Sequence, residues 1–473
     1  MSATAVPDDH EVDLIVIGAG PVGENVADYA GKRGLSTILV EEELVGGECS
    51  YWACMPSKAL LRSGSALAAA RRVDGARQAL TGTLDAGAVL ARRTAFTNDW
   101  DDSGQVQWLE SAGIGLVRGH ARLVGVREVE VDGERWRARA AVAVATGSVP
   151  VLPDIPGLAE AKPWSSRDAT GAQAVPGRLV VIGGGVVGAE LSLAYARLGA
   201  AVTVLTRSGL LGGFEPFAGD LVGDGLRDAG VDVRLGTSPS RVDRLDDGTV
   251  RVSLVDGGDI VADEVLVATG RSPRRSDLGL EAVGIDPAEL EVDDTMLVKG
   301  TDWLYAVGDV NGRALLTHQG KYEARAAGEA IAARRLGVPV DDAPWGAHVA
   351  TADAAAVPQV VFTDPEAASV GLTERMAKDR GVRVRVVDYE LGQVAGASLH
   401  ADDYRGRARL VVDEDRGVLV GATFVGQDVG ELLHAATIAV VGEVPIARLW
   451  HAVPAYPTMS EIWLRLLEAY GRP

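Results

Sequence analysis

The sequence predicts an α/β protein with two Rossmann-like domains followed by an α+β domain. Near residue 12 a short apolar run enters a glycine-rich turn and then a helical stretch, and the same pattern recurs near residue 178. Beyond roughly residue 345, short apolar runs alternate with turn residues, and helical stretches follow only near 430–441 and 459–470. Strands that alternate with helices indicate a parallel sheet, whereas strands joined by turns indicate an antiparallel one.

The composition narrows the class of protein. The chain has 473 residues, of which 47% are hydrophobic and 24% charged, so we expect a globular protein with a large core. Its formal net charge of −20 argues against nucleic acid and anionic membranes as partners. Two cysteines are too few for a disulfide scaffold or a four-cysteine zinc site, and no two histidines lie at metal-ligand spacing, so we expect no metal site.

The cellular compartment is predicted from the N-terminal residues and from the length of the apolar runs. The first residues, MSATAVPDDHEVD, contain neither an apolar run nor a basic leader, so we expect no signal peptide. No stretch approaches the roughly 18 uninterrupted apolar residues of a transmembrane helix. We therefore expect a cytoplasmic protein, in which a persistent structural disulfide is unusual.

The first Rossmann-like unit begins with a predicted strand at 12–17. The turn that follows contains Gly18, Gly20 and Gly23, and the next strand ends in Glu41. The first glycine permits the tight turn, the second lets the backbone approach a pyrophosphate, and the third lets the helix pack on the strand. Glu41 is placed to accept hydrogen bonds from a ribose 2′-OH. We expect an adenosine without a 2′-phosphate here.

The second unit, 178–205, repeats this arrangement with Gly183, Gly185 and Gly188. A single glycine turn can exist without a ligand, but two copies in the same context predict two dinucleotide sites. The position expected to be acidic holds Thr206, and Arg207 follows. Arginine accommodates a 2′-phosphate, so this site favours NADPH over NADH. The alternative is that Arg207 is a solvated surface charge.

Three further apolar strands end in polar or glycine residues. Those at 141–150 and 263–273 both lead into Ala-Thr-Gly, and that at 303–310 ends in Gly308 and Asp309. Open α/β sheets bind ligands beyond the carboxyl ends of their strands, which is where Asp309 is expected.

The two cysteines, Cys49 and Cys54, lie in the segment GGECSYWACMPSKALLR. Pro56 predicts that a helix begins nearby, and a helix N-terminus favours the thiolate form of a cysteine. Such a pair beside a redox cofactor can cycle between dithiol and disulfide. The alternative is two buried reduced cysteines that act as small hydrophobic residues.

Taken together, these motifs resemble the flavoprotein pyridine nucleotide-disulfide oxidoreductases, which include dihydrolipoamide dehydrogenase and mercuric reductase. The resemblance spans Asp13 to Glu461 and adds GGGVVGAE, TGRSP, YAVGD and FTDPE to the motifs above. It implies an FAD-binding domain at 1–150 and 276–345, an NAD(P)H-binding domain at 151–275, and a C-terminal dimerisation domain at 346–473.

The resemblance also implies roles for individual residues. Cys54 is the thiolate next to the flavin, Cys49 is the interchange thiol that attacks the substrate, and Lys58 lies near the flavin and pairs with Glu190. Asp309 holds the ribityl or pyrophosphate part of FAD. The cofactor contacts expected from the motifs are Gly18, Gly20, Gly23, Glu41, Gly47, Lys58, Thr146, Gly147, Gly183, Gly185, Gly188, Thr206, Arg207, Gly270, Arg271, Gly308 and Asp309.

The C-terminal segment HAVPAYPTMSE departs from the family pattern. Most members have a histidine base where this chain has Tyr456, while the glutamate that orients the base corresponds to Glu461. Tyrosine, with a pKa of about 10, is a poor base at neutral pH. His451 is an alternative base that the spacing does not support. Tyrosine at this place resembles mercuric reductases, but the C-terminal cysteine pair of those enzymes is missing here.

Three functions follow from these observations. The first is electron transfer from NADPH, or NADH, through FAD and a Cys49–Cys54 disulfide to a disulfide or other thiol-reactive small molecule. The second is a quinone reductase or diaphorase in which electrons leave directly from FAD. The third is a flavoprotein subunit of a larger complex. In each case we expect a homodimer, and the resemblance implies active sites shared between subunits, with Tyr456 and Glu461 supplied in trans.

Overall fold

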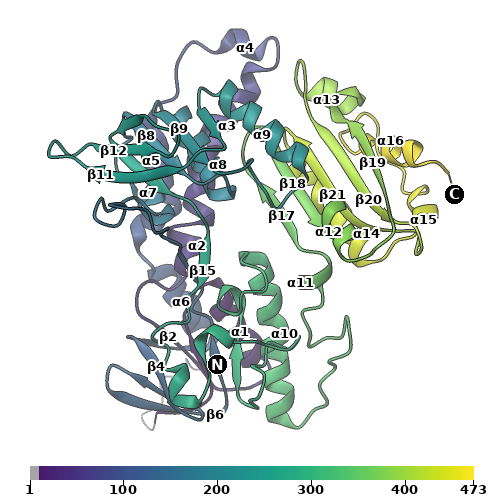
Figure 1. Ribbon diagram of the computed structural model, residues 1–473. Coiled ribbons are helices and arrows are strands. Elements are labelled where there is room, and N and C mark those ends of the chain that lie inside the picture. Colours follow the sequence, from purple (N-terminus) through teal and green to yellow (C-terminus); the bar gives the residue numbers. More distant parts are fainter. Residues whose placement is uncertain (1–9, 473) are drawn as a thin grey trace. The chain divides into compact units, whose positions relative to one another are not determined.

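The computed structural model describes residues 10–472 (Figure 1). Residues 1–9, on which the prediction of no signal peptide largely rests, lie outside the described part. The chain divides into two compact units, each assembled from three stretches of the sequence. The first unit contains residues up to 55, 94–149 and 271–353, and the second contains 56–93, 150–270 and 354 onward.

The first unit is built on a seven-stranded mixed sheet in the order β3-β2-β1-β6-β5-β4, with β16 paired to β6. Strands β3, β2, β1, β6 and β16 are parallel, whereas β4, β5 and β6 form an antiparallel meander. The strands are β1 (Glu11–Ile17), β2 (Thr37–Glu41), β3 (Gly115–Arg118), β4 (Ala121–Gly125), β5 (Glu128–Val131), β6 (Glu134–Val144) and β16 (Leu304–Ala306). A central parallel strand is covered on both faces, which is why β1 is an almost continuous apolar run.

Helix α1 begins at Pro21, because proline has no N–H to lose at the first turn of a helix. It packs against α10, and a side chain at Gly328 of α10 would meet the backbone of α1 at Val26, so the glycine allows close contact. The helical segments of this unit are α1 (Pro21–Lys32), α2 (Gly47–Tyr51), η1 (Asn98–Trp100), α6 (Ser103–Ala112), η2 (Leu280–Val283), η3 (Pro287–Glu289), η4 (Gly308–Asn311) and α10 (Thr317–Leu336). Three helices cross the boundary between the units, namely α3 (Cys54–Arg71), α5 (Ala86–Phe96) and α11 (Ala352–Ala355).

The second unit contains a four-stranded parallel sheet in the order β10-β9-β8-β14 and a three-stranded antiparallel sheet, β11-β12-β13. Its strands are β8 (Arg178–Ile182), β9 (Ala201–Thr206), β10 (Asp232–Leu235), β11 (Pro239–Arg244), β12 (Val250–Leu254), β13 (Asp259–Ala262) and β14 (Glu264–Val267). Its helices up to residue 228 are α4 (Ala76–Ala79), α7 (Ser166–Gly171), α8 (Val186–Arg197) and α9 (Pro216–Asp228).

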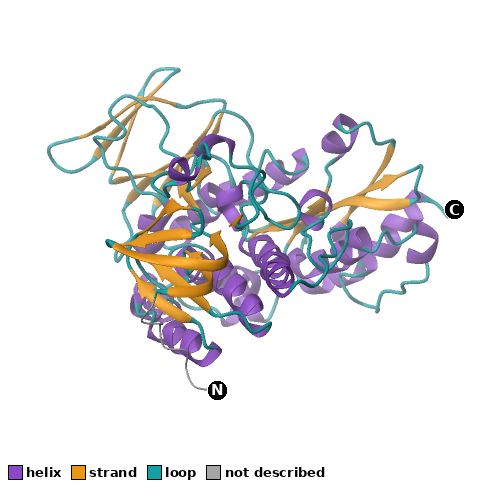
Figure 2. Cartoon of the chain, turned by 90° about the horizontal axis from the view of Figure 1, so that it is seen from below, coloured by secondary structure: helices purple, strands orange, loops and turns teal. Residues whose placement is uncertain are grey.

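The C-terminal part of the second unit is a five-stranded antiparallel sheet in the order β17-β18-β21-β20-β19, and α14 and α16 pack against it (Figures 1 and 2). The strands are β17 (Pro358–Val361), β18 (Glu366–Gly371), β19 (Val384–Glu390), β20 (Arg407–Asp413) and β21 (Val418–Gly426). The helical segments are α12 (Glu374–Asp379), η5 (Leu391–Gln393), α13 (Ala395–His400), η6 (Val429–Leu432), α14 (Leu433–Val441), α15 (Ile446–Leu449) and α16 (Glu461–Tyr470).

The predicted fold class is confirmed: two Rossmann-like sheets, one mixed and one parallel, precede an α+β domain. Two predicted strands lead into their Ala-Thr-Gly as expected, and a second short strand follows each of these tripeptides. The run at 141–150 is the end of β6 plus β7 (Ser148–Pro150), and that at 263–273 is β14 plus β15 (Arg271–Pro273). Gly147 and Gly270 have φ of +75° and +131°, values that end a strand. Within residues 10–472, no helix is long and apolar enough to cross a membrane.

Candidate functional site

The first and third glycines of each fingerprint are required by the protein's own packing. Gly18 has φ of +100°, and a Cβ there would lie 2.6 Å from the carbonyl oxygen of Ala145. A Cβ at Gly23 would overlap the carbonyl oxygen of Gly18. In the second unit, a Cβ at Gly183 would overlap Ala268, and one at Gly188 would overlap Gly183.

The second glycine of each fingerprint has no such explanation. A Cβ at Gly20 or Gly185 would have no described atom within 4 Å, and both residues have negative φ. Each is the N-cap of a twelve-residue helix, α1 or α8, with no side chain capping the first N–H groups. Open space beside uncapped N–H groups suits an anion. The residues present therefore fit a bound pyrophosphate at both turns.

Glu41 lies at the end of β2 and approaches the first turn. Its Oε2 accepts a hydrogen bond from the N–H of Ala19 at 2.7 Å, and its Oε1 accepts one from the N–H of Glu43 at 2.9 Å. Burial raises the pKa of this carboxyl, although the two N–H donors oppose that shift. Each carboxylate oxygen retains a lone pair that can accept from a ribose hydroxyl.

Asp309 ends a polar chain that joins the three stretches of the first unit. Ser148 Oγ donates to Asp309 Oδ2 at 2.6 Å, and Arg271 Nε donates to Ser148 Oγ at 2.8 Å. The Arg271 guanidinium also lies 3.5 Å from the carboxylate of Glu48, the residue before Cys49. Burial raises the pKa of Asp309, and the Ser148 hydrogen bond opposes the shift. The sequence alone did not indicate a role in the site for Ser148 or Glu48, because the residues that they contact are distant along the chain.

The two cysteines lie together as thiols, with Thr317 beside them. Cys54 is the first residue of α3, and its Sγ lies 3.3 Å from the hydroxyl oxygen of Thr317, the first residue of α10. Cys54 raises the pKa of the Cys49 thiol, first by a hydrogen bond and also by its charge, and burial adds to this rise. A hydrogen bond from Thr317 and the positive charge of Lys321 lower the same pKa.

Other predicted contacts of the first unit lie around these groups. Gly47 has φ of +55°, and a Cβ there would lie 2.8 Å from Gly20 Cα. The Thr146 hydroxyl donates to the carbonyl of Arg274 at 2.8 Å, while Gly147 faces open space. Gly308 has φ of +79° and lies against Val22 of α1.

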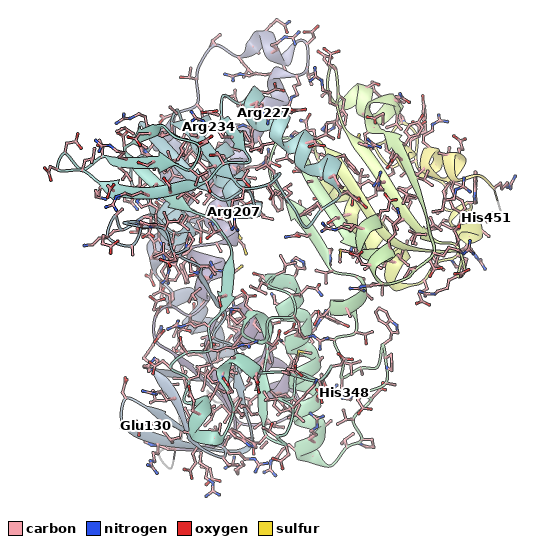
Figure 3. The ribbon with its side chains drawn as sticks, viewed as in Figure 1. Glu130, Arg207, Arg227, Arg234, His348 and His451 are labelled. Carbon is pink, nitrogen blue, oxygen red and sulfur yellow. The ribbon has the colours of Figure 1, made fainter. Side chains whose placement is uncertain are left out.

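In the second unit, Thr206 is buried at the end of β9 and Arg207 is exposed just beyond it (Figure 3). Among the described residues, no side chain or backbone group hydrogen-bonds or ion-pairs with Arg207. Arg234, on the neighbouring strand β10, instead pairs with Asp232 at 2.8 Å. Arg207 is therefore a cation that is available to a ligand.

Lys58 and Glu190 form an ion pair, with Lys58 Nζ 2.7 Å from Glu190 Oε2. The Glu190 side chain is 4% exposed, and its Oε1 accepts a hydrogen bond from the N–H of Phe362 at 3.0 Å. The ammonium of Lys58 lies over the Phe362 ring, 4.9 Å from its centroid. The sequence did not indicate Phe362, which links the FTDPE segment to α8.

The C-terminal segment places its two predicted residues in different surroundings. Tyr456 is 77% exposed, whereas Glu461 is buried at the start of α16. Glu461 accepts from the N–H of Ala395 at 3.2 Å and pairs with Arg465 at 2.7 Å. His451 is also exposed on this unit (Figure 3). Within one chain, Glu461 therefore stabilises helix α16 through Arg465 and the start of α13 through the N–H of Ala395.

Two dinucleotide turns, a polar cluster at a strand end and a pair of adjacent thiols define a redox enzyme with two nucleotide cofactors. The chain belongs to the pyridine nucleotide-disulphide oxidoreductase family, whose model matches residues 12–333, and the family's dimerisation domain matches residues 357–466. It is therefore an FAD-dependent, NAD(P)H-linked oxidoreductase, and the dimerisation domain supports a homodimer.

Relatives and solved structures agree with this assignment. The chain is 34% identical to a dihydrolipoyl dehydrogenase of Thermus scotoductus over 97% of both chains. It is 31% identical to a mercuric reductase of Staphylococcus aureus, over 96% of this chain and 81% of the other. The structure of the HOCl-induced flavoprotein disulfide reductase RclA from Escherichia coli matches with a TM-score of 0.81 at 25% identity, over 96% of this chain and 99% of the other.

Proposed function

We propose that this enzyme passes electrons from NADPH through FAD and the Cys49–Cys54 pair to a disulfide or another thiol-reactive small molecule. The observation that carries the proposal is the adjacency of the two sulfur atoms at the N-terminus of α10, with the Thr317 hydroxyl beside them. Cys54 and burial keep the pKa of Cys49 raised, whereas the Thr317 hydroxyl and Lys321 oppose that rise, and helix N–H groups favour one thiolate in the pair.

The two cysteines have different roles in this proposal. The Cys49 thiolate attacks one sulfur of an acceptor disulfide, which forms a mixed disulfide and releases the other sulfur as a thiolate. The Cys54 thiolate then attacks the Cys49 sulfur, which forms the internal disulfide and releases the second acceptor thiolate. Two electrons have thus left the dithiol, and protons from the solvent neutralise the two products.

FAD, when bound, supplies two-electron chemistry that returns the internal disulfide to the dithiol at the expense of NADPH. Gly20, Glu41 and Asp309 hold this cofactor in the proposal. Lys58, kept in place by Glu190, would lie near the flavin, where its positive charge would stabilise the added negative charge.

The nucleotide preference rests on Arg207. A guanidinium without a protein partner suits the 2′-phosphate of NADPH, and Thr206 replaces the carboxylate that would repel it. We propose that the glycines 183, 185 and 188 receive the pyrophosphate of the same nucleotide.

The remaining assignments follow the family pattern. We propose that 1–150 and 276–345 bind FAD, that 151–275 binds NADPH, and that 346–473 forms the dimer interface. Tyr456, at 77% exposed, is free to enter the partner subunit's active site. We also propose that the enzyme is cytoplasmic, where cysteines without structural roles remain reduced.

The test is an anaerobic titration of the purified yellow protein with NADPH, followed by the visible spectrum. A long-wavelength charge-transfer band after two electrons, before the flavin bleaches, is the expected result. The band requires a Cys54 thiolate next to oxidised flavin. Immediate bleaching without such a band would contradict a disulfide in the electron path.

The exposed Tyr456, which replaces the usual histidine base, favours one competing function. In this alternative, electrons leave directly from FAD to a quinone. Replacing Cys49 with serine separates the two functions, because the substitution abolishes disulfide reduction and leaves quinone reduction intact. Thr317→Ser, which keeps the hydroxyl beside the sulfur atoms, is the matched control. If Cys49→Ser leaves the turnover of every acceptor unchanged, the alternative replaces the proposal.

A further inference from the structure

Two buried carboxyl groups face each other behind the turn that carries Asp309. Glu323, in the second turn of α10, is 0% exposed, and the side chain of Asp353, in α11, is 1% exposed. Glu323 Oε1 and Asp353 Oδ2 are both buried, and within the described chain neither accepts a hydrogen bond from an N–H group. The two side chains interact directly.

The other oxygen of Glu323 binds both ends of the turn η4. Glu323 Oε2 accepts from the N–H of Gly308 at 2.6 Å and from Nδ2 of Asn311 at 2.7 Å. Asn311 Nδ2 also donates to the carbonyl of Ala306 at 3.2 Å, which joins the turn to the end of β16. Asp309 lies between the two anchored residues, so its position depends on Glu323.

The surroundings of the pair allow one negative charge and disfavour two. Asp353 accepts from Gln319 Nε2 at 2.7 Å and lies 3.3 Å from Nε of Arg313, the one cation that ion-pairs with it among the described residues. Asp294 adds a nearby negative charge, and Tyr322 is neutral because its pKa is raised. Two carboxylates in a buried site cannot both ionise at low cost, so one proton remains between them.

We propose that Glu323 and Asp353 share this proton, and that Glu323 is a positioning residue whose hold on the Gly308–Asn311 turn keeps Asp309 ready for FAD. The inference rests on the proposed placement of FAD against Asp309. It assigns a function to a pair of acids for which the mechanism proposed above has no role.

The proposal predicts a loss of FAD affinity at alkaline pH. Burial, and then the charge of Asp353, raise the pKa of Glu323 from 4.5 to about 8. Between these two values the folded protein holds a proton that the unfolded chain has lost, so stability falls as pH rises through the window. Above pH 8 both carboxyl groups are charged, and their mutual repulsion disfavours the folded arrangement in which Glu323 lies against the turn, although the hydrogen bonds from Gly308 and Asn311 oppose this effect.

The experiment measures the FAD dissociation constant of the full-length protein below and above pH 8 in three forms. The wild type should lose roughly tenfold in affinity per pH unit above that value, because one proton is released. Glu323→Gln keeps an acceptor for the turn and a donor for Asp353, so its affinity should not depend on pH. Glu329→Gln is the control, since Glu329 lies on the same helix but pairs with Arg33.

A second readout does not depend on the cofactor. Just below pH 8, where Glu24 and Glu366, whose pKa values are raised to about 7, are mostly ionised, the infrared spectrum of the apoprotein should contain the carbonyl band of a buried protonated carboxylic acid, and Glu323→Gln should lack it. If the wild type never binds FAD, the proposed function fails, while the band still decides whether the proton is shared. An alkaline loss of affinity that persists in Glu323→Gln, or the absence of the band in the wild type, would overturn this inference.

Discussion

The hydroxyl of Thr317 interacts with both sulfur atoms of the cysteine pair. It lies 3.3 Å from Cys54 Sγ, and its hydrogen bond also lowers the pKa of Cys49. The sequence revealed the cysteine pair, because the two residues are neighbours in one motif. It could not reveal Thr317, which is 263 positions from Cys54 and reaches it only through the packing of α10.

Replacing Thr317 with valine keeps the shape of the side chain and removes the donor. A hydrogen bond to a charged group contributes about 1.5–3 kcal/mol, and about 1.4 kcal/mol corresponds to one pKa unit. The pH profile for alkylation of the reduced protein by iodoacetamide should therefore move up by about one to two pH units. Thr317→Ser should retain the wild-type profile. An unmoved profile in the valine variant would mean that the hydroxyl does not stabilise the thiolate.

The role proposed for Arg207 follows from the lack of a protein partner for its side chain within the described part of the chain. Removal of this side chain should therefore change the free energy of unfolding little. We expect Arg207→Ala to raise KM for NADPH at least about tenfold, since it removes a charged contact to phosphate, and to leave KM for NADH unchanged. Arg234→Ala is the control. A similar rise in KM for both nucleotides would mean that Arg207 has a structural role and does not contact the 2′-phosphate.

At the scale of the element, the glycine turns separate what the fold requires from what the ligand requires. The fingerprint spacing predicted both strand–turn–helix units, because glycine positions are local information. Only the structure distinguishes Gly23, where a Cβ would overlap Gly18, from Gly20, where it meets open space. Similarly, the ion pair between Lys58 and Glu190 followed from resemblance, whereas the Phe362 contact depends on a segment 172 positions from Glu190.

Alanine substitutions test this distinction. Gly20→Ala should leave the Tm of the apoprotein unchanged and weaken FAD binding, because its methyl group occupies the space beside the uncapped N–H groups of α1. Gly23→Ala should destabilise the apoprotein itself, by about 1–3 kcal/mol as for other overpacked sites. The measurements are thermal unfolding without cofactor and fluorescence titration with FAD. Equal destabilisation by both variants would remove the argument for a pyrophosphate at Gly20.

At the scale of the whole molecule, the resemblance implied a first domain that is interrupted once, at 151–275, whereas the first compact unit is interrupted twice. Three stretches of the chain form the first unit. The last of them, residues 271–353, adds a strand to the sheet whose first strand begins at residue 11. Strand β16 pairs with β6 from 160 or more positions away, and no local pattern specifies that pairing. The same return brings Arg271, Asp309 and Thr317 to the motifs of the N-terminal stretch, so the candidate site exists only in the folded unit.

The proposed homodimer makes a prediction that only two chains together can satisfy. If Tyr456 acts in the partner's active site, Cys49→Ser and Tyr456→Ala remove residues that belong to different chains of one site. Each variant alone should have low disulfide reductase activity. After subunit exchange, half of the dimers are mixed, and one of the two sites in each mixed dimer is intact, so about a quarter of the wild-type activity should return. Sedimentation should confirm dimers throughout. No recovery despite verified exchange would place both residues in one chain's site, because every mixed dimer would then contain two defective sites.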